Sequence, residues 1–182
     1  EGHATLDAFI AQLQKEELAT IVRGEGMSSP KVTPGTASAF GGVSDALHAY
    51  GIPVACCSDG PSGIRMEGGW KATQLPIGTL LACSFNLPMM EELYEMEGKE
   101  LVSNEIDTLL GPGINIHRHP LNGRNFEYYS EDPFVTGTFA AAAVRGIKKG
   151  GSTATVKHFA ANDQEKARHT VDAVVSERAL RE

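Results

Sequence analysis

Short apolar runs that end in polar, glycine-containing loops and are followed by long helical segments constrain this fold more than any other feature. Three such runs lie at residues 52–58, 108–116 and 153–159. The helices expected after them cover residues 87–106, 133–150 and 176–182. Apolar strands that alternate with helices indicate a parallel sheet covered by helices. The sequence therefore predicts an α/β protein.

The first fifty residues have a different character from the rest of the chain. Apolar residues at near-helical spacing predict an amphipathic helix over 6–23, and Ser44 is a plausible N-cap for a short helix over 44–50. Between them, residues 24–42 are rich in Gly, Ser, Thr and Pro, which predicts a long loop. We therefore expect residues 1–50 to lead into the main α/β unit at 51–182.

The number of strand–helix units is too small for a closed barrel. A complete (β/α)₈ barrel needs roughly 200 to 250 residues, whereas three units in 182 residues are about half of one. An open barrel would leave a strand edge exposed. We expect a partial (β/α)₈ TIM-barrel, incomplete in this chain, that is completed by the remainder of the same protein or by a second chain. The start at Glu1, without Met or a signal-like segment, suggests a cut end.

Charge and cysteine content exclude several classes of function. A net charge of −7 with no basic patch argues against nucleic acid and anionic membranes as partners. No apolar stretch approaches the roughly 20 residues of a membrane span. The chain has three cysteines, Cys56, Cys57 and Cys83, and an odd number does not indicate a disulfide framework. The adjacent pair would face opposite sides of a strand, which makes it a poor metal site. We expect reduced, half-buried thiols in a cytoplasmic protein.

Asp59 directly follows the first apolar run and precedes Gly60-Pro61, so its carboxylate should lie at a barrel mouth. There it could accept two sugar hydroxyls, or instead form a turn with its own backbone. Arg65, six residues later, could pair with Asp59, reach a sugar or form a surface ion pair.

The second run opens into a loop that is dense in Arg, His, Asn and carboxylates. Arg124 has Glu127 nearby to fix its guanidinium, which suits vicinal hydroxyls but also a purely structural pair. Glu131-Asp132 could suggest a glycosidase carboxylate pair, but Asp132 before Pro133 is better explained as a helix N-cap. His117 and His119 are interpreted as hydrogen-bonded loop histidines rather than metal ligands.

Lys157 and His158 end the third run. Adjacent strand residues normally point to opposite faces, so both reach one ligand only at a twisted strand end. On chemistry alone, Lys157 could instead be the Schiff-base lysine of an aldolase-like barrel.

The order and spacing of these motifs over residues 51–182 resemble glycoside hydrolase family 3, the β-glucosidase type. The first fifty residues match only loosely. The segments that carry the resemblance are Ser58-Asp59-Gly60-Pro61, Ser84-Phe85-Asn86, 111–120, 123–127, 130–133, 157–162 and 176–182.

The resemblance implies a neutral sugar, a β-glucoside or related oligosaccharide, bound without metal or cofactor. The residues implied to hold its glycone are Asp59, Arg65, Arg124, Lys157, His158 and Arg168. It also implies a retaining mechanism with an Asp nucleophile in a later Ser/Thr-Asp-Trp motif, which this sequence lacks; its single tryptophan, Trp70, follows Gly68-Gly69. We expect the acid/base residue outside the chain as well, so the chain alone should be inactive. Two alternatives to a glycoside hydrolase stay open: the aldolase-like barrel and a non-catalytic carbohydrate-binding fragment.

Overall fold

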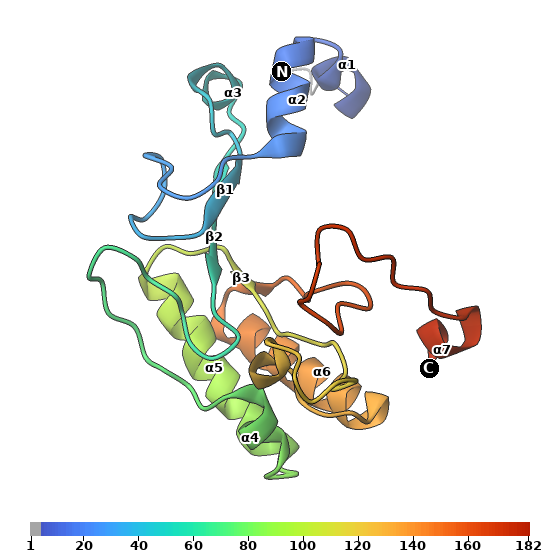
Figure 1. The fold of residues 1–182 in the computed structure, drawn as a ribbon. Coiled ribbons are helices and arrows are strands. Elements are labelled where there is room, and N and C mark those ends of the chain that lie inside the picture. The colour runs from blue at the N-terminus through green and yellow to red at the C-terminus, as the bar shows by residue number, and fades with distance from the viewer. Residues whose placement is uncertain (1–4) are drawn as a thin grey trace.

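The computed structural model describes residues 5–182 and contains one four-stranded sheet in the order β1-β2-β3-β4 (Figure 1). The strands are β1 (Ser38–Gly41), β2 (Val54–Asp59), β3 (Thr108–Leu110) and β4 (Thr153–Ala154). β2, β3 and β4 are parallel, with Cys57 opposite Thr108 and Thr108 opposite Thr153. The expected parallel arrangement is confirmed for these three strands.

The prediction of a continuous loop over 24–42 is wrong, because β1 lies within this segment. It pairs with β2 in the antiparallel direction, with Ala39 opposite Cys56. On its other side, Ala39 exchanges two backbone hydrogen bonds with Glu25, of 2.8 and 3.1 Å. The Gly- and Ser-rich composition hides this strand because long-range pairing, rather than local propensity, holds it in place.

β3 and β4 are shorter than the strands predicted over 108–116 and 153–159. β3 ends at Leu110, before Gly111-Pro112, because proline has no N–H for the ladder. β4 ends at Ala154, and the segments that follow the two strands pair again at an isolated bridge between Gly113 and Lys157. The polar residues beyond these strands therefore lie on irregular backbone.

Two long helices, α5 (Leu87–Ser103) and α6 (Pro133–Gly150), lie side by side and pack against the sheet (Figure 1). Asn86 caps α5 by accepting from the Met89 N–H at 3.1 Å, and Asp132 caps α6 by accepting from the Phe134 N–H at 2.7 Å. Both helices were predicted, although α5 ends three residues earlier than expected. The core that they form with the sheet includes Met90, Tyr94, Leu101, Leu109 and Ile147.

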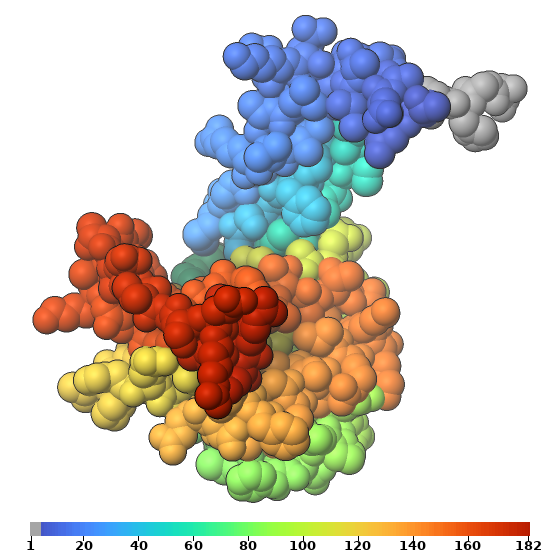
Figure 2. Space-filling view, turned by 90° about the vertical axis from the view of Figure 1, so that its right-hand side faces the viewer, coloured from blue at the N-terminus to red at the C-terminus, as the bar shows by residue number. Residues whose placement is uncertain are grey.

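The expected helix over 6–23 is two helices, α1 (Leu6–Ile10) and α2 (Lys15–Arg23). Gln14 begins α2 through a capping box with Glu17, which interrupts the helix. The predicted short helix is present as α3 (Asp45–Ala49), capped by Ser44. Figure 2 shows the residues coloured dark blue, which include α1 and α2, projecting from the body of the molecule that contains α5 and α6.

Three short helices complete the fold: α4 (Gly78–Ala82), the 3₁₀ helix η1 (Asn125–Glu127) and α7 (Glu177–Arg181). The sheet does not close into a barrel within residues 5–182, as the partial barrel predicts. None of the helices described there combines the length and the apolar character that crossing a bilayer requires.

All three cysteines are free thiols. Cys56 and Cys57 are buried, which raises the pKa of both thiols. The expectation of half-buried thiols is wrong for all three, because Cys56 and Cys57 are buried and Cys83, beyond α4, is exposed.

Candidate functional site

A cavity of about 440 Å³ lies at the carboxyl end of the parallel strands. Its lining includes Asp59 from the end of β2, Leu110 from the end of β3, and Lys157 and His158 beyond β4. Met27, Gly35 and Ala37 line it from the segment before β1. Arg65 and Glu67 come from the loop after β2, and Thr155 directly follows β4. Parallel α/β folds place their ligand sites at this edge.

A chain of alternating charges runs from this cavity into the adjoining loops. Lys157 Nζ lies 2.5 Å from Asp59 Oδ1 and 3.4 Å from Glu127 Oε2. Glu127, whose side chain is 4% exposed, also accepts from Arg124 Nε at 2.5 Å. Two further pairs continue the chain outward, because Glu165 lies 3.7 Å from Arg124 and 3.2 Å from Arg168. Three carboxylates thus alternate with three cations.

His158 is fixed by its backbone and by its ring. Its N–H donates to Asn115 Oδ1 at 2.8 Å, and its carbonyl accepts from Asn115 Nδ2 at 3.1 Å. Its Nδ1 lies 2.9 Å from the hydroxyl of Tyr128, which also hydrogen-bonds to Asn162. Burial, together with Arg124, lowers the pKa of His158, and burial raises the pKa of Tyr128 to about 12. Both groups are therefore neutral at pH 7.

The predicted site residues differ in where the structure places them. Asp59, Lys157 and His158 all line the cavity. Lys157 and His158 can both do so, although they are adjacent, because β4 ends at Ala154 and the alternating directions of strand side chains no longer apply. Arg124 reaches Lys157 through their shared partner Glu127. Arg65 lines the cavity, but its guanidinium binds Glu67 at 2.5 Å rather than the Asp59 carboxylate.

Arg168 lies farther out, on an exposed turn where it pairs with Glu165. It does not line the cavity.

The sequence predicted the pairing of Glu127 with Arg124 but not the contact of Glu127 with Lys157. The contributions of Tyr128, Asn115 and Glu165 were not predicted. Tyr128 follows Glu127 directly, and Asn115 lies in the quoted 111–120 motif. For Asn115 the available signal was a polar side chain between Ile114 and Ile116, whereas Tyr128 and Glu165 lack such apolar neighbours.

Two predictions about neighbouring loop residues are confirmed. Asp132 is the N-cap of α6, so its carboxylate serves the helix. His117 Nε2 lies 2.8 Å from the Asn125 carbonyl, and His119 Nδ1 accepts from the Leu121 N–H at 3.1 Å. Both histidines therefore stabilise the loop.

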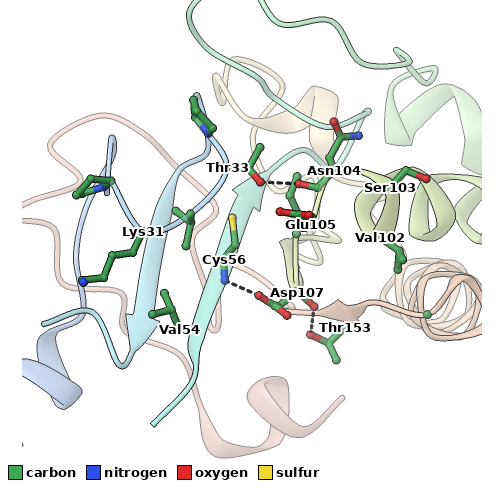
Figure 3. Close-up of a pocket in the computed structure, with 15 residues that line it drawn as sticks. Lys31, Thr33, Val54, Cys56, Val102, Ser103, Asn104, Glu105, Asp107 and Thr153 are labelled. Atoms are coloured by element: carbon green, nitrogen blue, oxygen red, sulfur yellow. Dashed lines mark hydrogen bonds between the residues drawn. The ribbon is translucent and has the colours of Figure 1, made fainter. Parts of the chain in front are cut away.

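A larger hollow of about 1050 Å³ lies near the amino ends of the strands (Figure 3). There Asp107 Oδ2 accepts from the Cys56 N–H at 2.6 Å, and Thr33 donates to the Asn104 carbonyl at 2.7 Å. These polar groups satisfy the backbone of neighbouring segments. Parallel sheets bind ligands at the carboxyl edge of their strands. The cavity of about 440 Å³ at that edge is therefore the better candidate for the functional site, although it is the smaller of the two.

The family model described as the glycosyl hydrolase family 3 N-terminal domain matches residues 6–182. The chain belongs to glycoside hydrolase family 3. The match extends into the first fifty residues, where the motifs alone gave only a loose resemblance.

Relatives agree with this assignment. The chain is 61% identical to a β-glucosidase of Ruminococcus albus over 181 residues, which is all of this chain and 19% of the relative. A crystal structure of a Paenibacillus barengoltzii β-glucosidase superposes with a TM-score of 0.93 and 77% identity, over 98% of this chain and 19% of that one.

A more distant structure, β-glucosidase 3B of Thermotoga neapolitana in complex with glucose, gives a TM-score of 0.76 and 34% identity over 87% of this chain and 23% of that chain. The chain thus spans about a fifth of the length of the relatives that it matches. Family membership does not favour the aldolase or the non-catalytic carbohydrate-binding alternative.

Proposed function

We propose that the protein carrying this chain is a retaining β-glucosidase and that the cavity at the carboxyl edge of the sheet holds the glycone of its substrate. The observation that carries this proposal is the convergence of Asp59, Lys157 and His158 on one cavity. A carboxylate accepts hydrogen bonds from sugar hydroxyls, whereas an ammonium group donates them. The three groups together can fix the orientation of a pyranose ring.

The balance of charge favours a neutral sugar. Three carboxylates and three cations alternate along the network, so the region carries no large excess of either sign. An anionic substrate would find each cation already paired with a carboxylate. The relatives named β-glucosidase, and the glucose complex of the Thermotoga neapolitana enzyme, support glucose or a closely related sugar.

We assign Asp59 and Lys157 to binding rather than to bond cleavage. The Asp59 carboxylate is paired with the Lys157 ammonium group, which lowers its nucleophilicity. The Lys157 ammonium in turn has carboxylates on two sides, whereas imine formation needs an unpaired neutral amine.

The nucleophile and the acid/base residue would then come from outside these 182 residues, either from the remainder of the same enzyme or from a complementing chain. The resemblance implies a nucleophile in a Ser/Thr-Asp-Trp motif, which this sequence lacks, and its single tryptophan, Trp70, lies in an exposed loop. Arg65, Arg124 and Arg168 would support the glycone site from its rim. Free thiols at Cys56 and Cys57 favour a reducing compartment such as the cytoplasm.

The test is hydrolysis of p-nitrophenyl β-D-glucopyranoside by the full-length protein, with its intact mass recorded in the same sample. Asp59→Asn removes one charged hydrogen-bonding group, so kcat/KM should fall by roughly 10- to 150-fold. Asp172→Asn, at an exposed residue outside the cavity, is the matched control.

Three results would each overturn a part of the proposal. Wild-type protein that does not hydrolyse the glucoside would refute the activity, and an Asp59→Asn variant within twofold of wild type would refute the site. Hydrolysis by a polypeptide of only 19.4 kDa would refute the claim that the catalytic pair lies elsewhere.

A further inference from the structure

Glu97, in the middle of α5, is a buried acidic residue outside the charge network. The residue is 2% exposed, and neither carboxyl oxygen has a hydrogen-bond partner among residues 5–182. The hydroxyl of Ser62 is likewise buried and unpartnered there. Buried polar atoms are nearly always paired, so this carboxyl requires an explanation.

Glu97 belongs to a row of three α5 side chains that face the loop of residues 60–75. One turn before it, the Tyr94 hydroxyl donates to the Pro61 carbonyl at 2.6 Å. One turn after it, Glu100 Oε1 accepts from the Thr73 N–H at 2.9 Å. Glu97 itself lies against the backbone of Gly63. Figure 1 shows the segment between β2 and α4 running beside α5, so this row supports the 60–75 loop.

The 60–75 loop forms part of the wall of the proposed sugar cavity. The Arg65 N–H donates to the Asp59 carbonyl at 2.7 Å, and Ser58 Oγ donates to the Arg65 carbonyl at 2.9 Å. Farther along, the Glu67 N–H donates to the Gly35 carbonyl at 2.9 Å, across the cavity wall. A displacement of this loop would therefore move Asp59 and Arg65 together.

The surroundings of Glu97 favour its neutral form. Burial raises the pKa of Glu97 to about 8, the nearby Glu100 carboxyl adds to the rise, and the Gly63 backbone offsets part of it. The other titratable groups close to it are Tyr94 and Tyr129, whose pKa values are themselves raised by burial. Glu97 has no cationic partner within the described residues.

We propose that Glu97 is a positioning residue for the sugar cavity, because its neutral carboxyl fits beneath the 60–75 loop and its ionisation displaces that loop. An ionised Glu97 would lie beside Glu100 without a counter-ion, and it could regain hydration only by separating the loop from α5. The displacement would carry Arg65 and Asp59 away from their places in the cavity. This inference rests on the proposed function only where it concerns sugar affinity.

Hydrogen exchange of the 60–75 amides in the full-length protein tests the structural part. After correction for the intrinsic pH dependence of exchange, wild-type amides should exchange at least tenfold faster at pH 9 than at pH 6.5. Glu97→Gln, which keeps the shape but cannot ionise, should abolish the increase. Glu92→Gln, at an exposed position of the same helix, should behave as wild type.

A flat wild-type profile, or an equal increase in Glu97→Gln, would overturn the inference. If Glu97→Gln does not fold, Glu97→Met supplies a second side chain that stays uncharged over the whole pH range. The same comparison applies to it, because an increase that persists without an ionisable group cannot come from Glu97.

The pH dependence of KM tests the link to the sugar site. Wild-type KM for the p-nitrophenyl glucoside should rise about tenfold between pH 6.5 and pH 9, while that of Glu97→Gln stays within twofold. A merely structural role predicts identical profiles for the two proteins, and that result would overturn the positioning role. Absence of hydrolysis would refute the proposed function alone, since hydrogen exchange still decides whether Glu97 controls the loop.

Discussion

Lys157 joins the proposed sugar cavity to the buried charge network, so the substitution Lys157→Met is the most informative single change in the site. Methionine keeps most of the apolar stem of lysine and removes the ammonium group. The variant leaves Asp59 and Glu127 without the cation that lies 2.5 and 3.4 Å from them.

The magnitude follows from these distances and from exposure. At an effective dielectric constant of about 20, each attraction is on the order of 5–7 kcal/mol, offset by several kcal/mol for desolvating each ion. Breaking a fully buried pair costs about 3–5 kcal/mol. Here Asp59 is 30% exposed and can be hydrated, and Glu127 keeps Arg124. We therefore expect a loss of about 2–3 kcal/mol in the free energy of unfolding.

Thermal unfolding and steady-state kinetics of the full-length protein measure the two consequences. Because its relatives are about five times as long as this chain, the unfolding midpoint should fall by only about 1–2 °C. The value of kcat/KM for p-nitrophenyl β-D-glucopyranoside should fall by roughly 10- to 150-fold, because a charged donor is lost. Lys148→Met is the control, because Lys148 is exposed on α6 and has no ion pair in the part of the chain that the structure describes. Lys157→Met with the stability and kinetics of that control would refute the reasoning.

Two further predictions concern the scaffold and its pH response. A Cβ at Gly146 would overlap the Glu91 carbonyl oxygen of α5, so Gly146→Ala should lower the free energy of unfolding by about 1–3 kcal/mol. Gly137→Ala on the same helix meets nothing within 4 Å and should stabilise by about 0.5–1 kcal/mol; equal effects in thermal unfolding would contradict the close α5–α6 packing. The folded protein keeps His158 neutral because burial lowers its pKa, whereas the unfolded chain takes up a proton below about pH 6.5. Stability should therefore fall as the pH drops below 6.5, and His158→Gln should reduce this loss when unfolding midpoints are compared between pH 5 and 8. His48→Gln, at an exposed position, should retain the wild-type slope; identical slopes for all three proteins would refute this role of His158.

The parts of the fold that sequence reasoning predicted are those with local signals. Asn86 and Asp132 mark the beginnings of α5 and α6, and Gly151, with a φ of 100°, ends α6 in the left-handed conformation that glycine favours. β1 lacks such a signal. Its four residues become a strand only because β2, from a later part of the chain, lies beside them.

In the candidate site, too, the contacts with a local sequence signal could be predicted and those without one could not. Asp59 and Lys157 follow apolar runs, so their position at the carboxyl edge could be predicted, and the Arg124–Glu127 pair spans only three residues. The contact between Lys157 and Glu127 joins residues 30 positions apart and depends on how η1 packs against the end of the third run. For Arg65, a carboxylate two residues away, Glu67, competes successfully with the predicted partner Asp59.

A crystal structure of the full-length protein with bound glucose tests the central claim most directly. The account predicts a pyranose ring in the cavity at the carboxyl edge, with hydroxyl groups within hydrogen-bond distance of the Asp59 carboxylate and the Lys157 ammonium group. Glucose bound instead in the hollow beside Asp107, with the carboxyl-edge cavity free of sugar, would contradict it.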